Sequence, residues 1–423
     1  MNYSTKKEYN IGKLFRFLFY LTFLIAFVVP HSFQILTAAL IGLTGVFSII
    51  YLVSQNIYKP NYIDLFYLFS LVINSIYIVI GINNNAYPDS ISQSVIIYAI
   101  FPLLWIFIFR AAYYFLNYKT FINMFGYFTI ISALTVAAFF YLFTTFGADS
   151  VKMFIENPNI TVNNGVYAAT LFVYASFIFV ASATFAVPYI FEGPVLRNTC
   201  IVSVLAVTAT SGRSALLISC IIGVILRIFF RKFRHTDAKY QKEFSIYRLL
   251  IFAFSLISAI GFLYYFINVT SGVDISYTFE TIYRKIGEGG GEERRDQWLA
   301  LWNGIRQTSG LGAGHGVGVD LVRSDQYPWR YELFPVAMIY RVGVIGFALM
   351  MMPYFIYVIR FLKAAVKHNV TLLDSFMFAG FLGMFAASTT NPYPESFIYQ
   401  WMLIGPMVLF EEYHSNFMRS RKV

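Results

Sequence analysis

Long apolar runs alternate with short polar segments along almost the whole chain. The runs fall near residues 14–29, 33–53, 62–82, 95–109, 121–146, 166–191, 197–210, 214–230, 246–269, 333–360, 372–388 and 396–411. A membrane-spanning helix needs about 20 mostly apolar residues, so most of these runs are long enough to cross a bilayer. The pattern predicts an all-α polytopic membrane protein with about 12 transmembrane helices, forming one integral membrane domain over residues 1–423. The short seventh and eighth runs could instead form one broken or re-entrant segment.

The basic residues gather in every second connection between these runs, for example at Lys59 and Arg360. The intervening connections 83–94 and 147–165 contain a single basic residue, Lys152. Because Lys and Arg are retained in cytoplasmic loops, this alternation predicts that both termini are cytoplasmic and that 83–94 and 147–165 lie outside.

The connection 270–332 is long and polar, and it carries both arginines and acids. Long translocated loops are exempt from the positive-inside bias, so we place it on the outer face, between helices 9 and 10. A polar loop of this length in a compact membrane protein usually has a function.

Within this loop, residues 292–307 predict a helix, with acids in its first turn and Ser309-Gly310 after its end. Its apolar stripe consists of Trp298, Leu301, Trp302 and Ile305. Arg295 and Arg306 fall close to Trp302 on a helical wheel. We expect an amphipathic helix lying on the membrane surface, with its cations at the level of the lipid headgroups.

Composition supports a membrane protein and excludes several other classes. The chain is 58% hydrophobic and 12% charged, whereas soluble domains carry about 25% charged residues. The net charge of +10 follows from basic cytoplasmic loops and does not indicate nucleic acid as a partner. Cys200 and Cys220 fall in apolar runs and are expected to be packing residues.

Several motifs that would indicate a cofactor are missing from the sequence. It has no Asp-x-Asp, no His/Cys cluster at metal-ligand spacing and no Gly-x-Ser-x-Gly. We therefore expect no metal and no cofactor, and we do not expect a hydrolase triad.

Arginines at membrane depth are the first candidates for chemistry. An arginine at that depth must line a cavity or pair with an anion, and its guanidinium binds phosphate through two parallel hydrogen bonds. Arg213 lies in Thr210-Ser211-Gly212-Arg213-Ser214, between two short apolar runs; the alternative is a side chain that snorkels to the interface. Arg341 lies about 12 Å below the outer surface by helical rise, where the alternative is a structural ion pair.

A second group of arginines lies in the outer loop itself. Arg284, Arg294 and Arg295 are candidates to bind an anion. The alternative is a solvated charge run, because acids flank Arg294 and Arg295 and could neutralise them locally.

The segment 310–318 is rich in glycine, with His315 at its centre. Its glycines could let backbone amides approach an anion, or let the chain fold back on the membrane. His315 is either a base or binding residue, or a polar loop residue. Glu332 follows Trp329, at the mouth of the tenth helix, where it is either a general base or an acid stabilised by the helix dipole.

The order of these motifs resembles a known family. The motifs are Thr210-Ser211-Gly212-Arg213-Ser214, Arg294-x-x-x-Trp298-x-Ala300-Leu301, Gly310-x-Gly312-x-Gly314 and Gly343-x-x-Gly346. Together, over about residues 200 to 410, they resemble the O-antigen polymerase and O-antigen ligase superfamily (Wzy-like and WaaL-like proteins). Ligases of this superfamily carry a His-Asn type motif just before the helix with Gly343, where this chain has Arg330-Tyr331-Glu332 and no histidine. This difference favours a Wzy-like polymerase, with Glu332 in the place of the ligase histidine.

The resemblance implies a metal-independent glycosyltransferase in the bacterial inner (cytoplasmic) membrane, acting at its periplasmic face. A growing glycan on undecaprenyl diphosphate would be the donor, and a single lipid-linked repeat unit the acceptor. The expected partners are these lipid-linked oligosaccharides, membrane lipid and a chain-length regulator. The lipid tails require a lateral groove between helices.

Specific roles follow from this expectation. The diphosphate would be held by Arg213, Arg284, Arg294, Arg295 and Arg341. Glu332, or failing it His315, would accept the proton of the attacking hydroxyl. The sugars would contact Trp298, Trp329, Arg330 and Tyr331, although aromatic anchoring at the membrane surface is the more common role of tryptophan there.

Three other functions remain open at this point. The first is a ligase that transfers glycan to lipid A core. The second is a flippase for lipid-linked oligosaccharides, which predicts charges throughout a central cavity and two pseudo-repeated halves. The third is a sensor or assembly protein, which leaves the arginines at membrane depth without a role.

Overall fold

The computed structural model describes residues 6–420, apart from 31–32, 148, 151–158, 164–165, 171–173, 192, 211–213, 234–290, 324 and 326. The predicted ninth helix, 246–269, and the first part of the outer loop, 270–290, therefore lie outside the described residues.

Six described helical segments are long and apolar enough to cross a membrane. They comprise α1 (Lys6–Val28), α2 (Gln34–Ser54), α3 (Tyr62–Asn83), the segment Pro88–Phe115, α6 (Tyr118–Phe146) and α14 (Phe334–Val366). The fourth segment joins α4 (Pro88–Val95), a π-helical turn (Ile96–Ile100) and α5 (Phe101–Phe115). Large apolar side chains such as Ile35 and Ile345 are more than two-thirds exposed, as expected for a surface covered by lipid. The molecule is thus a helical, membrane-embedded protein.

Five further helices complete the described bundle. They are α8 (Tyr174–Ala186), α9 (Pro194–Thr210), α10 (Ser214–Phe233), α15 (Leu372–Ala387) and α16 (Trp401–Ser420). The short α9 and α10 agree with the predicted seventh and eighth runs, and they are separate helices.

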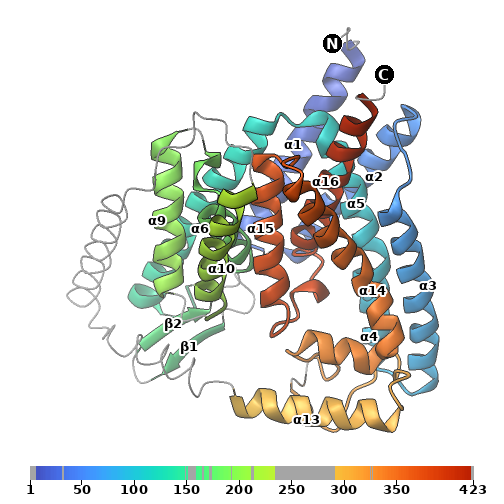
Figure 1. Cartoon of the computed structure of the whole chain (residues 1–423). Helices are drawn as coiled ribbons and strands as arrows, with labels where there is room; N and C mark the ends of the chain where they lie inside the picture. The colour runs from blue at the N-terminus through green and yellow to red at the C-terminus, as the bar shows by residue number, and fades with distance from the viewer. Residues whose placement is uncertain are drawn as a thin grey trace.

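Figure 1 shows that both termini lie at one end of the bundle, while α13 (Gly291–Gln307) lies across the opposite end. The antiparallel hairpin of β1 (Asn159–Asn163) and β2 (Val166–Thr170) lies at the same end as α13. The prediction that the two termini share one face, and that the polar connections lie on the other, agrees with this arrangement. Which face is cytoplasmic stays a prediction.

Two predicted boundaries were wrong. The run 166–191 was expected to be one helix, but its first residues form β2 and the helix α8 begins only at Tyr174. The reason is that an apolar run alone does not distinguish a strand from a helix. Val166–Thr170 pairs with Asn159–Asn163, which is rich in β-branched residues, and such residues favour strands. The connection 83–94 was expected to be a loop, but Pro88 starts helix α4, because proline suits the first turn of a helix.

Aromatic residues fill the core between α1, α5 and α16. Phe23 and Trp401 have ring centroids 5.0 Å apart, and both are fully buried. Near the end that carries the termini, the buried Arg110 forms a bidentate ion pair with Asp64 (2.6 and 2.7 Å) and contacts Glu412 at 3.1 Å. These ion pairs join α3, α5 and α16 inside the bundle.

Candidate functional site

The glycine-rich segment 310–318 packs tightly between α3, α4 and α14 at the end that α13 covers. Its backbone amides at Ala313 and Gly314 donate to the carbonyls of Tyr340 and Arg341, and the amide of His315 donates to Tyr77. These three amides are therefore satisfied by the protein and do not form an anion cradle. The segment folds back against α3 and α14 at these three positions; that it folds back on the membrane stays a prediction.

Glycine is required at several positions of this packing, as Gly314 and Gly343 illustrate. At Gly314, φ is 100°, and a Cβ would lie 2.2 Å from the backbone nitrogen of Gly81. At Gly343, φ is 70°, and a Cβ would lie 2.6 Å from the carbonyl oxygen of Leu311. The kink at Gly343 frees backbone groups of α14, which the segment 310–314 then pairs, for example Val344 N to Gly310 O at 3.0 Å.

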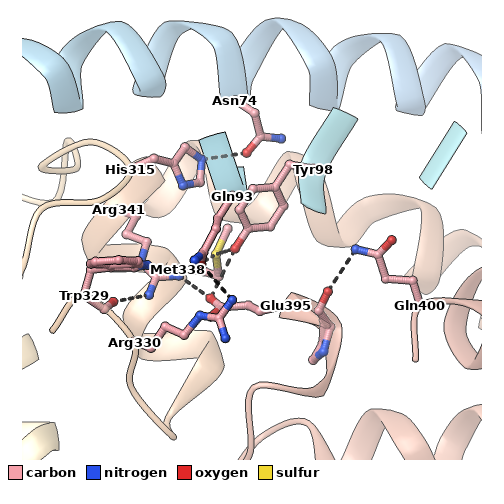
Figure 2. Close-up of polar contacts among 11 residues, drawn as sticks. Asn74, Gln93, Tyr98, His315, Trp329, Arg330, Met338, Arg341, Glu395 and Gln400 are labelled. Atoms are coloured by element: carbon pink, nitrogen blue, oxygen red, sulfur yellow. Dashed lines mark hydrogen bonds and ion pairs between the residues drawn. The ribbon is translucent and has the colours of Figure 1, made fainter. Parts of the chain in front are cut away.

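His315 is buried beneath this segment, and its ring lies 4.8 Å from that of Tyr98. Its Nε2 lies 2.7 Å from Oδ1 of Asn74 (Figure 2). The Nδ2 of Asn74 donates to the Ser70 carbonyl, so Oδ1 is the acceptor and Nε2 of His315 carries the proton. Burial, reinforced by the charge of Arg341, lowers the pKa of His315 to about 3. The ring is neutral, and a role as base is open only to Nδ1.

Arg341 and Glu395 form a buried ion pair inside the bundle (Figure 2). Arg341 also donates to the carbonyl of Trp329 at 2.6 Å, and the hydroxyl of Tyr98 donates to Glu395 at 3.2 Å. The alternative of a structural ion pair therefore describes Arg341 as the structure places it. Diphosphate binding by Arg341 stays a prediction that would require this pair to open.

Sequence reasoning missed Glu395. It lies in a short 3-10 turn, Tyr393–Glu395, between α15 and α16. A signal was present, because Glu395 is an acid between two prolines and an apolar run at the face predicted to be outside. A lone acid at membrane depth requires a cationic partner, and Arg341 was the cation available at a similar depth.

Glu332 is held by two arginines. Its carboxylate lies 3.0 Å from Arg294 and 2.5 Å from Arg323, and its backbone amide donates to Oε1 of Gln297 at 2.9 Å. The two arginine side chains are each 38% exposed, and that of Glu332 is 20% exposed. The structure thus joins two predicted site residues, Arg294 and Glu332, and adds Arg323, which sequence reasoning left out.

Two predicted sugar contacts, Trp329 and Tyr331, are buried in the structure, and their contact with sugar stays a prediction. Trp329 is 8% exposed and packs against Tyr87, and Tyr331 is fully buried with its hydroxyl accepting the amide of Val319 at 2.7 Å. Their faces are used for packing, because the loop that carries them closes over the start of α14. Burial also raises the pKa of Tyr331 above its ordinary value.

Other predicted site residues have different outcomes. Arg330 is half-buried, donates to Gln93 at 2.8 Å and lies over the ring of Tyr327. Trp298 and Arg295 are exposed on α13. Arg213 and Arg284 lie outside the described residues.

An apolar groove of about 320 Å³ adjoins the buried charges. It lies between α3, α5, α14 and α16, and reaches from Ile63 near the end with the termini to Phe334 at the start of α14. Ile97 and Tyr98 line both this groove and a small polar cavity with Arg330, Arg341 and Glu395. The apolar groove and the charged cavity therefore adjoin at the π-helical turn Ile96–Ile100. Such turns frequently occur at functional sites.

Within the described part of the chain, no group of three or more His, Cys, Asp or Glu side chains is arranged to hold a metal ion. Comparisons with protein-family models, with curated proteins and with solved structures found no match to this chain.

Proposed function

We propose that the protein is a repeat-unit polymerase for a surface polysaccharide such as O-antigen. It would transfer a growing glycan from undecaprenyl diphosphate to a single lipid-linked repeat unit at the periplasmic face of a bacterial inner membrane. The observation that carries this proposal is the contiguity of a long apolar groove and a cluster of arginines, bordered in common by Ile97 and Tyr98.

This arrangement fits a ligand with an anionic head and a long apolar tail. The groove is lined mainly by aromatic and aliphatic side chains and extends through much of the bundle depth, which suits the part of a polyprenyl chain nearest the diphosphate. Arg330 and Arg341 line the polar cavity that adjoins the groove. Arg294 and Arg323 hold Glu332, which follows Arg330 by two residues. Guanidinium groups are suited to bidentate binding of phosphate.

The ion pairs of Glu332 can be exchanged when the diphosphate binds. Salt bridges that are partly exposed are worth only about 0–1 kcal/mol, so a diphosphate with two negative charges can compete for Arg294 and Arg323. Transfer of the arginines to the diphosphate then releases the carboxylate of Glu332 as the proton acceptor. Arg213 and Arg284 remain candidates for the same anion on sequence grounds.

The proposed reaction forms one bond and breaks one. The acceptor hydroxyl oxygen attacks the anomeric carbon of the donor while the bond from that carbon to the diphosphate oxygen breaks. Undecaprenyl diphosphate leaves with the electron pair, and the hydroxyl proton passes to Glu332. The arginines stabilise the charge that develops on the leaving group.

A complementation assay tests the proposal, because it separates the alternatives by their products. In a strain lacking the native gene, the wild-type chain should restore a ladder of polymer lengths on the lipopolysaccharide. Glu332→Gln and the pair Arg294→Gln with Arg323→Gln should leave single repeats on the core at a normal protein level. Asp325→Asn, in the same loop, is the matched control and should give full ladders.

Two other outcomes would refute a polymerase. Polymer that forms but stays on undecaprenyl diphosphate would indicate a ligase. Loss of all periplasmic repeat units, with repeats accumulating on the cytoplasmic side, would indicate a flippase.

A further inference from the structure

The helix α13 has one exposed flank that the proposed reaction does not use. The predicted apolar stripe divides in the structure: Leu301 and Ile305 are buried against α14, whereas Trp298 and Trp302 are 45% and 39% exposed. The two indole rings are stacked with an interplanar angle of 7° and centroids 5.9 Å apart. Two adjacent tryptophans on one helix thus form a partly exposed aromatic surface.

The exposed charges of α13 are sorted by sign around the helix. Arg306 lies over the ring of Trp302, 5.7 Å from its centroid, and Arg295 falls only about 20° from Arg306 at 100° per residue. The exposed acids Glu293 and Asp296 fall about 140° and 160° from Trp298, on the other side of the helix. The aromatic flank is thus cationic, and its complement is an anionic surface.

We infer that the Trp298–Trp302 flank of α13, with Arg295 and Arg306, docks on the anionic headgroups of the membrane leaflet next to the bundle. Trp and Arg are the side chains enriched at membrane interfaces, where the indole lies among the headgroups and the guanidinium meets lipid phosphate. Figure 1 shows α13 lying across the end of the bundle, the orientation of an interfacial helix and not of a spanning one. The inference does not depend on the proposed reaction.

Docking of this flank has a mechanical consequence for the site. The half-exposed Arg294 and the buried Gln297 lie about 40° and 100° from Trp298 around α13, and both hold Glu332. A helix fixed to the leaflet by one flank holds these two side chains at a constant depth relative to the bilayer.

The experiment measures the depth of two positions on α13 in the full-length protein. Trp298→Cys and Asp296→Cys, about 160° apart on the helix, are each labelled with a nitroxide in lipid nanodiscs. The native Cys200 and Cys220 are buried, so unlabelled wild type sets the background. Collision with a water-soluble relaxation reagent is compared between phosphatidylcholine alone and phosphatidylcholine mixed with phosphatidylglycerol. Leu299→Cys, exposed beside Arg306 on the wheel, serves as a second reporter if Trp298→Cys does not fold.

The inference predicts that the label at 298 is shielded from the reagent and more so with phosphatidylglycerol, while that at 296 stays accessible. Adding Arg295→Gln and Arg306→Gln should shift the balance between the docked and water-facing states by about fivefold for each arginine. Equal accessibility at both positions in the anionic nanodisc would overturn the inference. Shielding that appears only when soluble repeat-unit oligosaccharide is added would also overturn it, and would make this surface a carbohydrate platform.

Discussion

The two ends of the bundle use arginine in different ways. At the end with the termini, Arg110 is 2% exposed and faces two carboxylates, Asp64 and Glu412. At the end with α13, the carboxylate of Glu332 is shared by two arginines that are each 38% exposed. The cluster of Arg110, Asp64 and Glu412 has more acidic than basic groups and lies inside the bundle, so its charges neutralise one another and do not bind an external ligand. The second has more base than acid and contacts solvent, so it can accept an external anion.

The buried ion pair Arg341–Glu395 shares one property with each of these two clusters. It is as buried as Arg110, but it lines the small polar cavity beside the apolar groove. The comparison teaches that depth alone does not identify a functional arginine; the balance of charges around it and its access to a cavity decide.

The largest expected effect on stability comes from a substitution in the Arg110 cluster, at the end with the termini. Arg110→Ala should destabilise the protein by about 3–5 kcal/mol, because it leaves Asp64 and Glu412 as uncompensated buried acids. Thermal unfolding of the purified protein in detergent, followed by loss of the monodisperse peak, measures this. Arg197→Ala, a half-buried arginine at the start of α9 that lies over the ring of Tyr189, is the control and should lower the unfolding temperature far less.

A similar loss of stability is expected when the ion pair between Arg341 and Glu395 is broken. Glu395→Gln should destabilise the fold by about 3–5 kcal/mol, since the charge of Arg341 is left without its carboxylate. The double variant Glu395→Gln with Arg341→Met should recover part of this stability because no unpaired charge remains. A double variant no more stable than Glu395→Gln alone would show that the pair is not the reason for the loss.

Alanine at Gly314 should destabilise the fold by roughly 1–3 kcal/mol from backbone conformation alone, with a further penalty from the contact with Gly81. Alanine at Gly42, where the space around a Cβ is open, is the matched control and should be neutral or slightly stabilising. Equal melting temperatures for the two variants would contradict the close packing of the glycine-rich segment.

The pH dependence of stability should report the burial of His315. Its pKa is lowered to about 3 in the folded protein, below the value of about 6.5 expected when unfolded. The unfolded chain therefore binds an extra proton between these values, so this contribution to stability is complete above about pH 6.5 and is lost as pH falls toward 3. The slope should reach at most about 1.4 kcal/mol per pH unit, and it should be missing in His315→Asn.

The smallest effect on stability, and a large one on function, is expected at the exposed cluster. Arg294→Gln and Arg323→Gln should each change the unfolding free energy by about 0–1 kcal/mol, yet shorten or abolish the polymer ladder. A large drop in melting temperature would mean that this cluster holds the fold together in the way that Arg110 does.

How much of the fold could be predicted depends on which sequence patterns have a direct physical cause. Apolar runs have a direct physical cause in the bilayer, so the helical membrane class, the helix 292–307 and the shared face of the two termini were predicted. The hairpin at 159–170 was missed because β2 lies at the start of an apolar run that continues into a helix.

The site was predicted only in part, because charge partners come from segments far apart in the chain. Arg294 and Glu332 are 38 residues apart and were both identified by their own local settings. Glu395 is 54 residues from Arg341, and the sequence links the two only through their similar predicted depth in the membrane. The amides of 313–315 could not be excluded as an anion site from sequence, since their acceptors lie on α3 and α14.

Binding of undecaprenyl diphosphate to the purified protein is the measurement that tests the central claim most directly. Native mass spectrometry of the wild-type chain should detect a stoichiometric complex with undecaprenyl diphosphate and far less with undecaprenol, which has the tail without the charges. The complex should weaken when Arg294 and Arg323 are both changed to Gln, and when the groove is filled by Ser70→Trp. Equal retention of both lipids, unchanged by these substitutions, would contradict the account.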